Sequence, residues 1–509
     1  MEYFKRVPME LFLEIVGYLA PRDLFRLAMA KKGFHRVLQD VLDRHKLLYK
    51  KHGLLVLGNN NLSWICLDTI TQDPSIVTYM ESCQITSVQS GYLNDKGIKE
   101  LPDVEDANRW TSLVLQSPLL QSMDFPVDSP ASSAFELKDC IENGHQGPIL
   151  ARVLTIAVNI RRLDLILSPY IAEFLCDFLA RLSEEYLNHR RILRSFELPF
   201  QHLEQVSILY KNQRDDTRIS WLYLFKRIPS LKRLAARCIG QNLERGHDHG
   251  LAAITGESSQ KHVEKANIEQ LILIFCSGEV LGKLYILLEQ INGLKTFYMQ
   301  QSREPSPSET FTIESLTRAL ADYHSETLQI LWLANDSTRA IFEHVGKETM
   351  NDMTNHRGLW PPLFFNRLRL LYCDWSIVLN PSYCNIFFLV ESLEVLILEA
   401  CPTDTADDQY FVEKVMEPLC NLKALRATSW HDEKGDTPFM LMMKAFAIDK
   451  GLKWLTEKDC WTLEQSIRKF SDQLDMEDLL EANVEQQVED VRQEGELAEG
   501  MESSSESDS

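Results

Sequence analysis

Apolar residues recur in the middle of the chain with a short, regular spacing. Within residues 151–430, one apolar residue is followed by a second three positions later and a third two positions after that, as at Ile160, Leu163 and Leu165. The same spacing begins at five further positions, which are Leu193, Ile268, Leu294, Leu328 and Leu393. Segments with helical patterning precede several of these copies. Short apolar strands that alternate with helices predict an α/β fold.

The distance between copies indicates which α/β fold to expect. A single copy is weak evidence, because about 9% of windows match three fixed positions by chance in a chain that is 45% apolar. With three looser copies included, the middle residues of nine copies lie 25 to 40 residues apart, about 33 on average. Leucine-rich repeats run about 20–29 residues, with one strand in each. We therefore predict a degenerate leucine-rich-repeat-like solenoid with insertions.

A doubly wound α/β domain is the main alternative, because it alternates helices and strands in the same way. We favour the solenoid, since no glycine-rich phosphate-binding turn follows a strand. The motifs of serine hydrolases, zinc proteases and kinases are absent as well. We expect a protein without catalytic residues, metal or cofactor. An α/β enzyme whose catalytic groups lie far apart in the sequence stays open as a less favoured alternative.

Residues 1–50 have a helical pattern instead. Leu11, Ile15 and Leu19 lie on one side of a first helix, which the proline at position 21 ends. Two further short helices are expected to follow it. Three such helices are too small to bury their apolar faces on one another, so we expect a partner, either in this chain or in another.

The remaining segments complete the predicted organisation. Residues 51–150 are expected to link the helices to the solenoid and to cap its start, with candidate strands at 80–85 and 120–125. Residues 151–465 form the predicted repeat domain. Residues 466–509 form an acidic tail that we expect to be partly helical and then disordered.

Charge is concentrated in that tail. Residues 471–509 carry 14 acids and one base, which is −13 of the total net charge of −21 and leaves −8 for the other 470 residues. An acidic chain is a poor candidate for nucleic-acid binding. No apolar run is long enough for a membrane span, no signal peptide is expected, and the 11 cysteines are scattered without a Cys-x-x-Cys pair. We expect no membrane or nucleic-acid partner, reduced thiols, and a cytoplasmic or nuclear location.

The N-terminal segment carries a series of spaced motif residues, which are Val7-Pro8, Glu10-Leu11, Ile15, Leu19, Asp23-Leu24-x-x-Leu27 and Lys32-Gly33-Phe34. In these residues the segment resembles the F-box. Val7 replaces the usual leucine, and Lys32-Gly33-Phe34 replaces the usual Cys-Lys-x-Trp. Together with the repeats, the chain is similar to F-box/leucine-rich-repeat proteins of the divergent fungal type.

This resemblance implies a function. F-box helices bind a Skp-type adaptor, which attaches to a cullin–RING ubiquitin ligase, while the repeats hold a protein substrate. The resemblance places the adaptor contacts at seven positions, which are Pro8, Leu11, Ile15, Leu19, Leu24, Leu27 and Phe34. The chain would then be a non-catalytic substrate receptor. Two alternatives stay open: the chain is a scaffold that binds the adaptor without a role in ubiquitination, or the helices only cap the solenoid.

Three aromatic residues are candidate substrate contacts. In each predicted strand the residue between the last two apolar positions points to the opposite face of the sheet. On three consecutive strands that residue is Tyr298, Trp332 or Tyr372. Neighbouring aromatic side chains of this kind anchor protein interfaces. The alternative is that a loop of this chain, or an apolar stripe at 480–491 in the tail, covers them.

Overall fold

The structure is a computed structural model of the 509-residue chain. Apart from isolated positions, it describes residues 8–57 without 20 and 31, 62–85, 104–117, 147–167, 199–210, 217–240 without 219 and 238, 265–301 without 277, 313–335, 365–374, 392–401, 419–429 and 437–468. The candidate strand at 120–125, the acidic tail and its stripe at 480–491 lie outside these residues.

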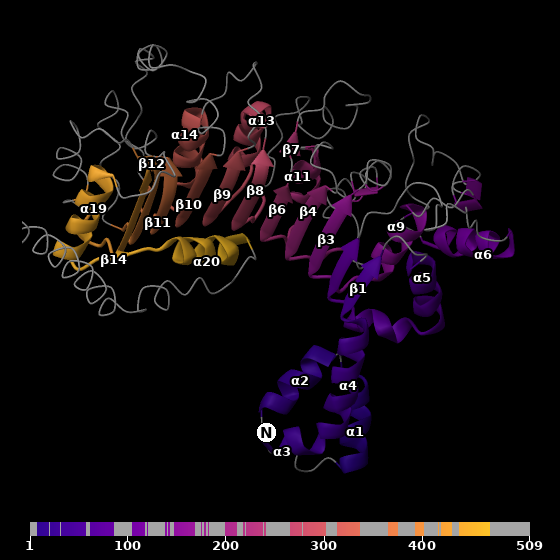
Figure 1. Ribbon diagram of the computed structural model, residues 1–509. Coiled ribbons are helices and arrows are strands. Elements are labelled where there is room, and N and C mark those ends of the chain that lie inside the picture. Colours follow the sequence, from indigo (N-terminus) through magenta and orange to yellow (C-terminus); the bar gives the residue numbers. More distant parts are fainter. Residues whose placement is uncertain are drawn as a thin grey trace, which may run out of the picture. The chain divides into compact units, whose positions relative to one another are not determined.

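The fold is mixed α/β, with a parallel sheet of 12 strands that lie in the sheet in the same order as in the chain (Figure 1). These strands are β1 (Leu54–Leu57), β2 (Ser82–Ile85), β3 (Arg162–Leu167), β4 (Gln205–Tyr210), β6 (Arg233–Arg237), β8 (Gln270–Cys276), β9 (Thr296–Gln301), β10 (Ile330–Asn335), β11 (Leu370–Asp374), β12 (Val395–Cys401), β13 (Ala424–Ser429) and β14 (Lys453–Trp454). The two-residue strands β5 (Thr217–Arg218) and β7 (Ile239–Gly240) lie outside this sheet. A doubly wound sheet differs, because its strand order reverses at a switch point.

Most of the predicted strands are confirmed. The apolar copies that begin at Ile160, Ile268, Leu294, Leu328 and Leu393 coincide with β3, β8, β9, β10 and β12, and the looser copies with β6, β11 and β13. The candidate strand at 80–85 is β2. The copy at 193–198 lies outside the described residues, and β4 begins further along the chain. The prediction missed β1, β4 and β14.

The chain divides into two compact units, Met1–Lys232 with His247–Ser259 and Arg233–Gly246 with Gln260–Ser509, called here unit 1 and unit 2. Unit 1 begins with four helices, which are α1 (Met9–Gly17), α2 (Pro21–Ala30), α3 (Lys32–Val37) and α4 (Gln39–His52). The prediction of three helices was wrong by one. The break between α3 and α4 falls at Leu38, where neither glycine nor proline marks it.

A small core holds these helices together. It consists of Phe12, Val16, Leu24, Ala28 and Leu38, and the ring of Phe34 stacks on that of Phe12 at 5.4 Å between centroids. Helix α4 also packs on the 3₁₀ helix η2 (Pro74–Tyr79). His45 Nδ1 lies 2.7 Å from the Tyr79 hydroxyl, and the Tyr49 hydroxyl donates to Glu81 at 3.2 Å.

Four more helices of unit 1 lie in its described residues, and they are α5 (Leu62–Gln72), α6 (Val104–Leu115), α9 (Gly147–Ile156) and α11 (Ser220–Phe225). The rings of Trp64 on α5 and Trp110 on α6 lie 4.1 Å apart. Asp68 accepts a hydrogen bond from Trp110 Nε1 at 3.2 Å and from Arg109 at 2.7 Å. These contacts fix α6 against α5.

Unit 2 has helices on both faces of its strands. Figure 1 shows α13 (Gly278–Glu289) and α14 (Ile313–His324) on one side and α20 (Glu457–Arg468) on the other. Helix α19 (Pro438–Asp449) lies beside the last two strands of the sheet, β13 and β14. The strands read as continuous apolar runs such as Leu271-Ile272-Leu273 because both faces are buried.

Candidate functional site

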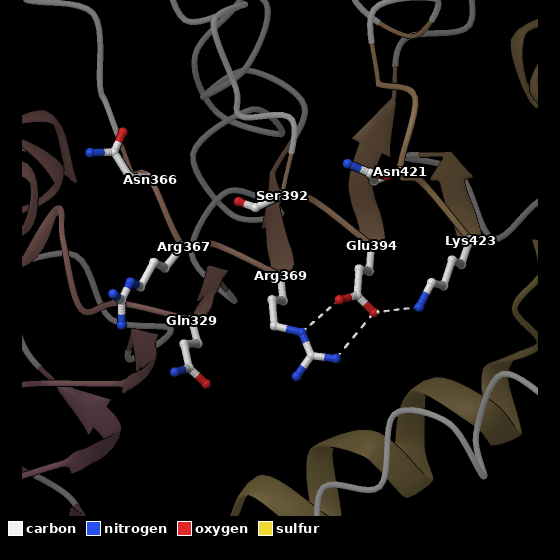
Figure 2. Close-up of a pocket in the computed structure, with 8 residues that line it drawn as sticks. All are labelled: Gln329, Asn366, Arg367, Arg369, Ser392, Glu394, Asn421 and Lys423. Atoms are coloured by element: carbon white, nitrogen blue, oxygen red, sulfur yellow. Dashed lines mark hydrogen bonds and ion pairs between the residues drawn. The ribbon is translucent and has the colours of Figure 1, made fainter.

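A polar pocket of about 420 Å³ lies at the N-terminal ends of strands β10 to β13 in unit 2 (Figure 2). Glu394 is its central acid: its carboxylate accepts from Arg369 at 2.7 and 3.2 Å and from Lys423 at 3.1 Å. The hydrogen bonds from Arg369 hold the pKa of this carboxyl below its ordinary value. The other lining residues are Gln329, Asn366, Arg367, Ser392 and Asn421. Because Arg369 and Lys423 already bind Glu394, the cluster ties neighbouring strands together.

The three predicted aromatic residues form one row in unit 2. Tyr298 pairs with Trp332, and Trp332 with Tyr372, as direct neighbours on β9, β10 and β11. The ring centroids of Tyr298 and Trp332 lie 5.8 Å apart, and those of Trp332 and Tyr372 lie 4.0 Å apart with an interplanar angle of 8°. The prediction that these side chains lie side by side is confirmed.

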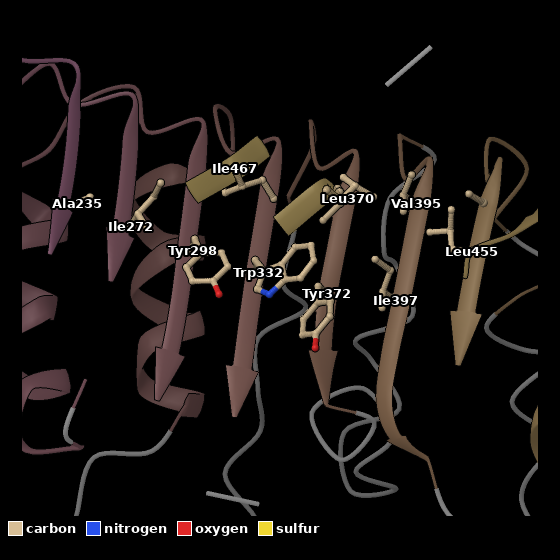
Figure 3. Close-up of a cluster of buried hydrophobic side chains, with 12 residues drawn as sticks. Ala235, Ile272, Tyr298, Trp332, Leu370, Tyr372, Val395, Ile397, Leu455 and Ile467 are labelled. Carbon is tan, nitrogen blue, oxygen red and sulfur yellow. The ribbon is translucent and has the colours of Figure 1, made fainter. Parts of the chain in front are cut away.

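The row extends further along the sheet. Ala235 and Ile272 continue it on β6 and β8, and Ile397 and Arg426 continue it on β12 and β13. We call the five residues Ile272, Tyr298, Trp332, Tyr372 and Ile397 the aromatic face. Figure 3 shows their side chains projecting from the same side of the strands.

Helix α20 covers the aromatic face. Leu463 and Ile467 pack into the same buried cluster as the aromatic rings, and Cys460 packs at its edge. Tyr298 is fully buried, and Trp332 and Tyr372 expose only 2% and 7% of their surface. The sequence left two possibilities for these rings, contact with a substrate or cover by this chain. In the structure the chain itself covers them, with helix α20, which precedes the stripe at 480–491 in the sequence.

Polar contacts fix α20 at its C-terminal end. The Tyr298 hydroxyl donates to Glu464 Oε1 at 2.6 Å and accepts from Arg468 Nε at 3.0 Å. Arg468 also donates to Gln300 Oε1 at 2.8 Å and forms an ion pair with Glu464. Burial, reinforced by the Glu464 carboxylate, raises the pKa of Tyr298, so its hydroxyl stays protonated and can donate.

One buried donor under α20 has no acceptor. In the part of the chain that the structure describes, Trp332 Nε1 is buried without a hydrogen-bond partner. An unsatisfied buried donor costs about 1–3 kcal/mol. The Trp332 N–H is therefore a polar group that α20 covers but does not bind.

The prediction did not identify α20, although the sequence carries a signal for it. Cys460, Leu463 and Ile467 are spaced by three and four positions, as on one side of a helix. Glu464 and Arg468 follow directly after Leu463 and Ile467, which places them beside the same surface.

The seven positions assigned to the adaptor separate into two groups. Pro8, Leu11 and Ile15 are exposed, with Leu11 at 51% and Ile15 at 49%. The other four lie in or against the small core, and they are Leu19, Leu24, Leu27 and Phe34. Leu24 is completely buried, so it cannot touch a partner while the helices keep this arrangement.

Sequence reasoning missed several exposed apolar side chains on the same helices. They are Met9, Leu13 and Tyr18 on or beside α1 and Phe25 and Met29 on α2. Tyr18 is 84% exposed and Met29 67%. Because α1 is apolar around most of its circumference, its sequence already indicates burial on two sides. Exposed apolar side chains in this number are typical of interaction surfaces.

Two kinds of site are absent from the residues that the structure describes. No group of three or more His, Cys, Asp or Glu side chains is placed to hold a metal ion there. None of the described helices is both long and apolar enough to cross a membrane.

No protein-family model matches the chain, and no curated protein matches it.

Proposed function

We propose that this protein is the substrate-recognition subunit of a Skp–cullin–F-box ubiquitin ligase. Residues 1–50, with helices α1 to α4, form the F-box and bind a Skp-type adaptor, and the strands and helices that follow form a leucine-rich-repeat-like solenoid that holds a protein substrate. The protein performs no chemistry. It raises the effective concentration of the substrate near the ubiquitin-loaded component.

The apolar surface of α1 and α2 carries this proposal. Among the described residues, five buried side chains form the core of the N-terminal helices, whereas seven large apolar side chains on or beside α1 and α2 are at least 42% exposed. These are Met9, Leu11, Leu13, Ile15, Tyr18, Phe25 and Met29. A partner that completes an unfinished core makes an unusually apolar interface, as obligate complexes do.

The strand order supports the solenoid. The described strand pairs of the sheet are parallel, and within each unit the strands lie in the sheet in the order in which they occur in the chain. Backbone bonds repeat the same step from one strand to the next: Gln329 donates to Lys295, Arg369 to Gln329, and Glu394 to Arg369. Regular stacking of one strand per repeat is typical of leucine-rich repeats.

The adaptor contact is tested by affinity purification of the full chain with purified Skp-type adaptor. The double variant Leu11→Asp, Ile15→Asp should bind the adaptor at least about 100-fold more weakly, because each burial of such a side chain contributes about 1.5–3 kcal/mol. Leu24 is not a suitable test position, since its replacement would disturb the core. Leu441→Asp is the matched control, because Leu441 is 55% exposed on α19 in unit 2.

Unchanged adaptor binding by the Leu11→Asp, Ile15→Asp variant would refute the proposed interface. The ligase role needs a second measurement, which is cullin-dependent ubiquitin transfer to proteins bound by the chain. Adaptor binding without any such transfer would favour the scaffold alternative.

A further inference from the structure

We infer that the aromatic face is a helix-binding surface, which α20 occupies within the chain and which binds an amphipathic helix of a partner protein in its place. The inference deepens the proposed function and rests on it for one point only, namely that the partner is the substrate to be ubiquitinated. The surface itself follows from the contacts of α20.

Helix α20 shows which apolar pattern fits. Leu463 and Ile467, one turn apart, enter the buried cluster of the aromatic face, and Cys460 lies against it one turn earlier. An amphipathic helix that lays such a stripe into an apolar groove is a common mode of protein recognition. A partner helix for this surface therefore carries apolar residues at positions equivalent to 460, 463 and 467.

Polar contacts add a specific requirement. Glu464 and Arg468 both bind the Tyr298 hydroxyl, one as acceptor at 2.6 Å and one as donor at 3.0 Å. At the other end of α20, Asp459 lies 3.5 Å from Nζ of the buried Lys453. The partner helix should thus carry an acid before its first apolar residue, an acid after its second and an arginine after its third.

Helix α20 is suited to exchange. Only two of its 12 residues, Leu463 and Ile467, are buried. An isolated helix of this length is marginal in water, so α20 owes its helical form mainly to the aromatic face. On its outer side Trp461 is 61% exposed.

The buried Trp332 Nε1 shows that α20 does not meet every requirement of the surface. In the described part of the chain this donor has no acceptor, although Trp332 lies in the centre of the aromatic row. A partner helix with a carbonyl or carboxylate side chain at that point would gain a hydrogen bond that α20 does not make.

The test is peptide binding in trans. The probe is a fluorescein-labelled peptide with the sequence of residues 455–470, and binding to the full chain is followed by fluorescence anisotropy. Two variants weaken the resident helix, Leu463→Asp with Ile467→Asp and the milder Leu463→Ala with Ile467→Ala. Both should bind the peptide at least about tenfold more tightly than the unmodified chain, because the resident helix no longer competes.

Matched controls locate the binding. A peptide that carries the same two aspartates should not bind any form of the chain. Adding Tyr298→Phe to the alanine variant should weaken peptide binding about tenfold, since the hydroxyl bound by Glu464 and Arg468 is lost. Adding Leu441→Asp on α19 should leave it unchanged.

Three outcomes would overturn the inference. The first is no peptide binding to either variant when both keep the circular dichroism of the unmodified chain. The second is equal binding to the unmodified chain and to the variants, which would place the peptide elsewhere. The third is loss of folding in both variants, because α20 would then be a fixed part of the core. Adaptor binding by the same proteins reports separately on the proposed function.

Discussion

Replacing Trp332 with alanine should be among the most destabilising single changes in unit 2. Trp332 is almost fully buried, and its ring stacks between those of Tyr298 and Tyr372. Truncation of a buried tryptophan costs about 3–5 kcal/mol through lost burial and the remaining cavity. Loss of two ring pairs adds about 0.5–1.5 kcal/mol each, and removal of the unpaired Nε1 donor returns about 1–3 kcal/mol. Because the last two contributions are of similar size and opposite sign, the expected decrease in the free energy of unfolding stays at about 3–5 kcal/mol.

Trp332→Phe separates these contributions. Phenylalanine keeps a ring between the two tyrosines and removes the buried N–H that has no acceptor among the described residues. The relief of about 1–3 kcal/mol opposes the loss of ring area, so the net decrease should be below about 2 kcal/mol. The difference between the alanine and phenylalanine variants therefore reports on the stack, and the small effect of phenylalanine reports on the unpaired donor.

The measurement is urea denaturation followed by circular dichroism, with Trp461→Phe as the control. Trp461 is 61% exposed on α20, so its replacement should change the free energy of unfolding by less than about 0.5 kcal/mol. If Trp332→Phe destabilises the chain as much as Trp332→Ala, the reasoning is refuted, because Nε1 would then have an acceptor that contributes to stability.

Three further predictions concern single side chains. Leu24→Asp should unfold the N-terminal helices, seen as a loss of helical circular dichroism, because it places a charge in their five-residue core. Burial lowers the pKa of His324 to about 4, so stability should fall as the pH drops from about 6.5 to about 4, where only the unfolded chain gains the proton; urea titrations across that range should show a loss of about 3 kcal/mol. Burial raises the pKa of Cys460 to about 12, so iodoacetamide at pH 8 should modify it slowly in the unmodified chain and faster in the Leu463→Ala, Ile467→Ala variant.

Each of these has a contrary result. Unchanged circular dichroism for Leu24→Asp would mean that the core tolerates a charge. A pH profile that His324→Gln does not flatten between pH 6.5 and 4 would assign the acid sensitivity to other groups. Equal alkylation of Cys460 in both forms would show that α20 opens readily without the substitutions, and the exposed Cys420 serves as the reference for full reactivity.

The apolar spacing predicted most of the strands because this signal is local. Residues that face the same side of a strand alternate along it, so the spacing that identifies a strand lies within six residues. The same rule explains the misses. Strand β1 is a continuous run, Leu54-Leu55-Val56-Leu57, which periodicity cannot distinguish from a helix. Leu203, Val206 and Ile208 repeat the spacing at β4, and nothing local ranks them above the copy at 193–198.

The candidate site was harder to predict because it joins distant segments. The Tyr298 hydroxyl forms hydrogen bonds with Glu464 and Arg468, which lie 166 and 170 residues further along the chain. Side chains that cover a surface leave no trace in the strands they cover, so Tyr298, Trp332 and Tyr372 look the same in the sequence whether they are open or buried. The burial of Leu24 is a similar case, since its role depends on Phe12 and Leu38 on other helices.

A comparison of equivalent positions in the two units nevertheless shows where a cover is needed. In unit 1 the row that corresponds to the aromatic face consists of Gln84, Asp164 and Ser207, which pair directly across β2, β3 and β4. Polar side chains there are compatible with water. In unit 2 the equivalent row is apolar from Ala235 to Ile397 and would expose several large side chains if it were open. The apolar row of unit 2 therefore requires a cover, and α20 is the cover that this chain supplies.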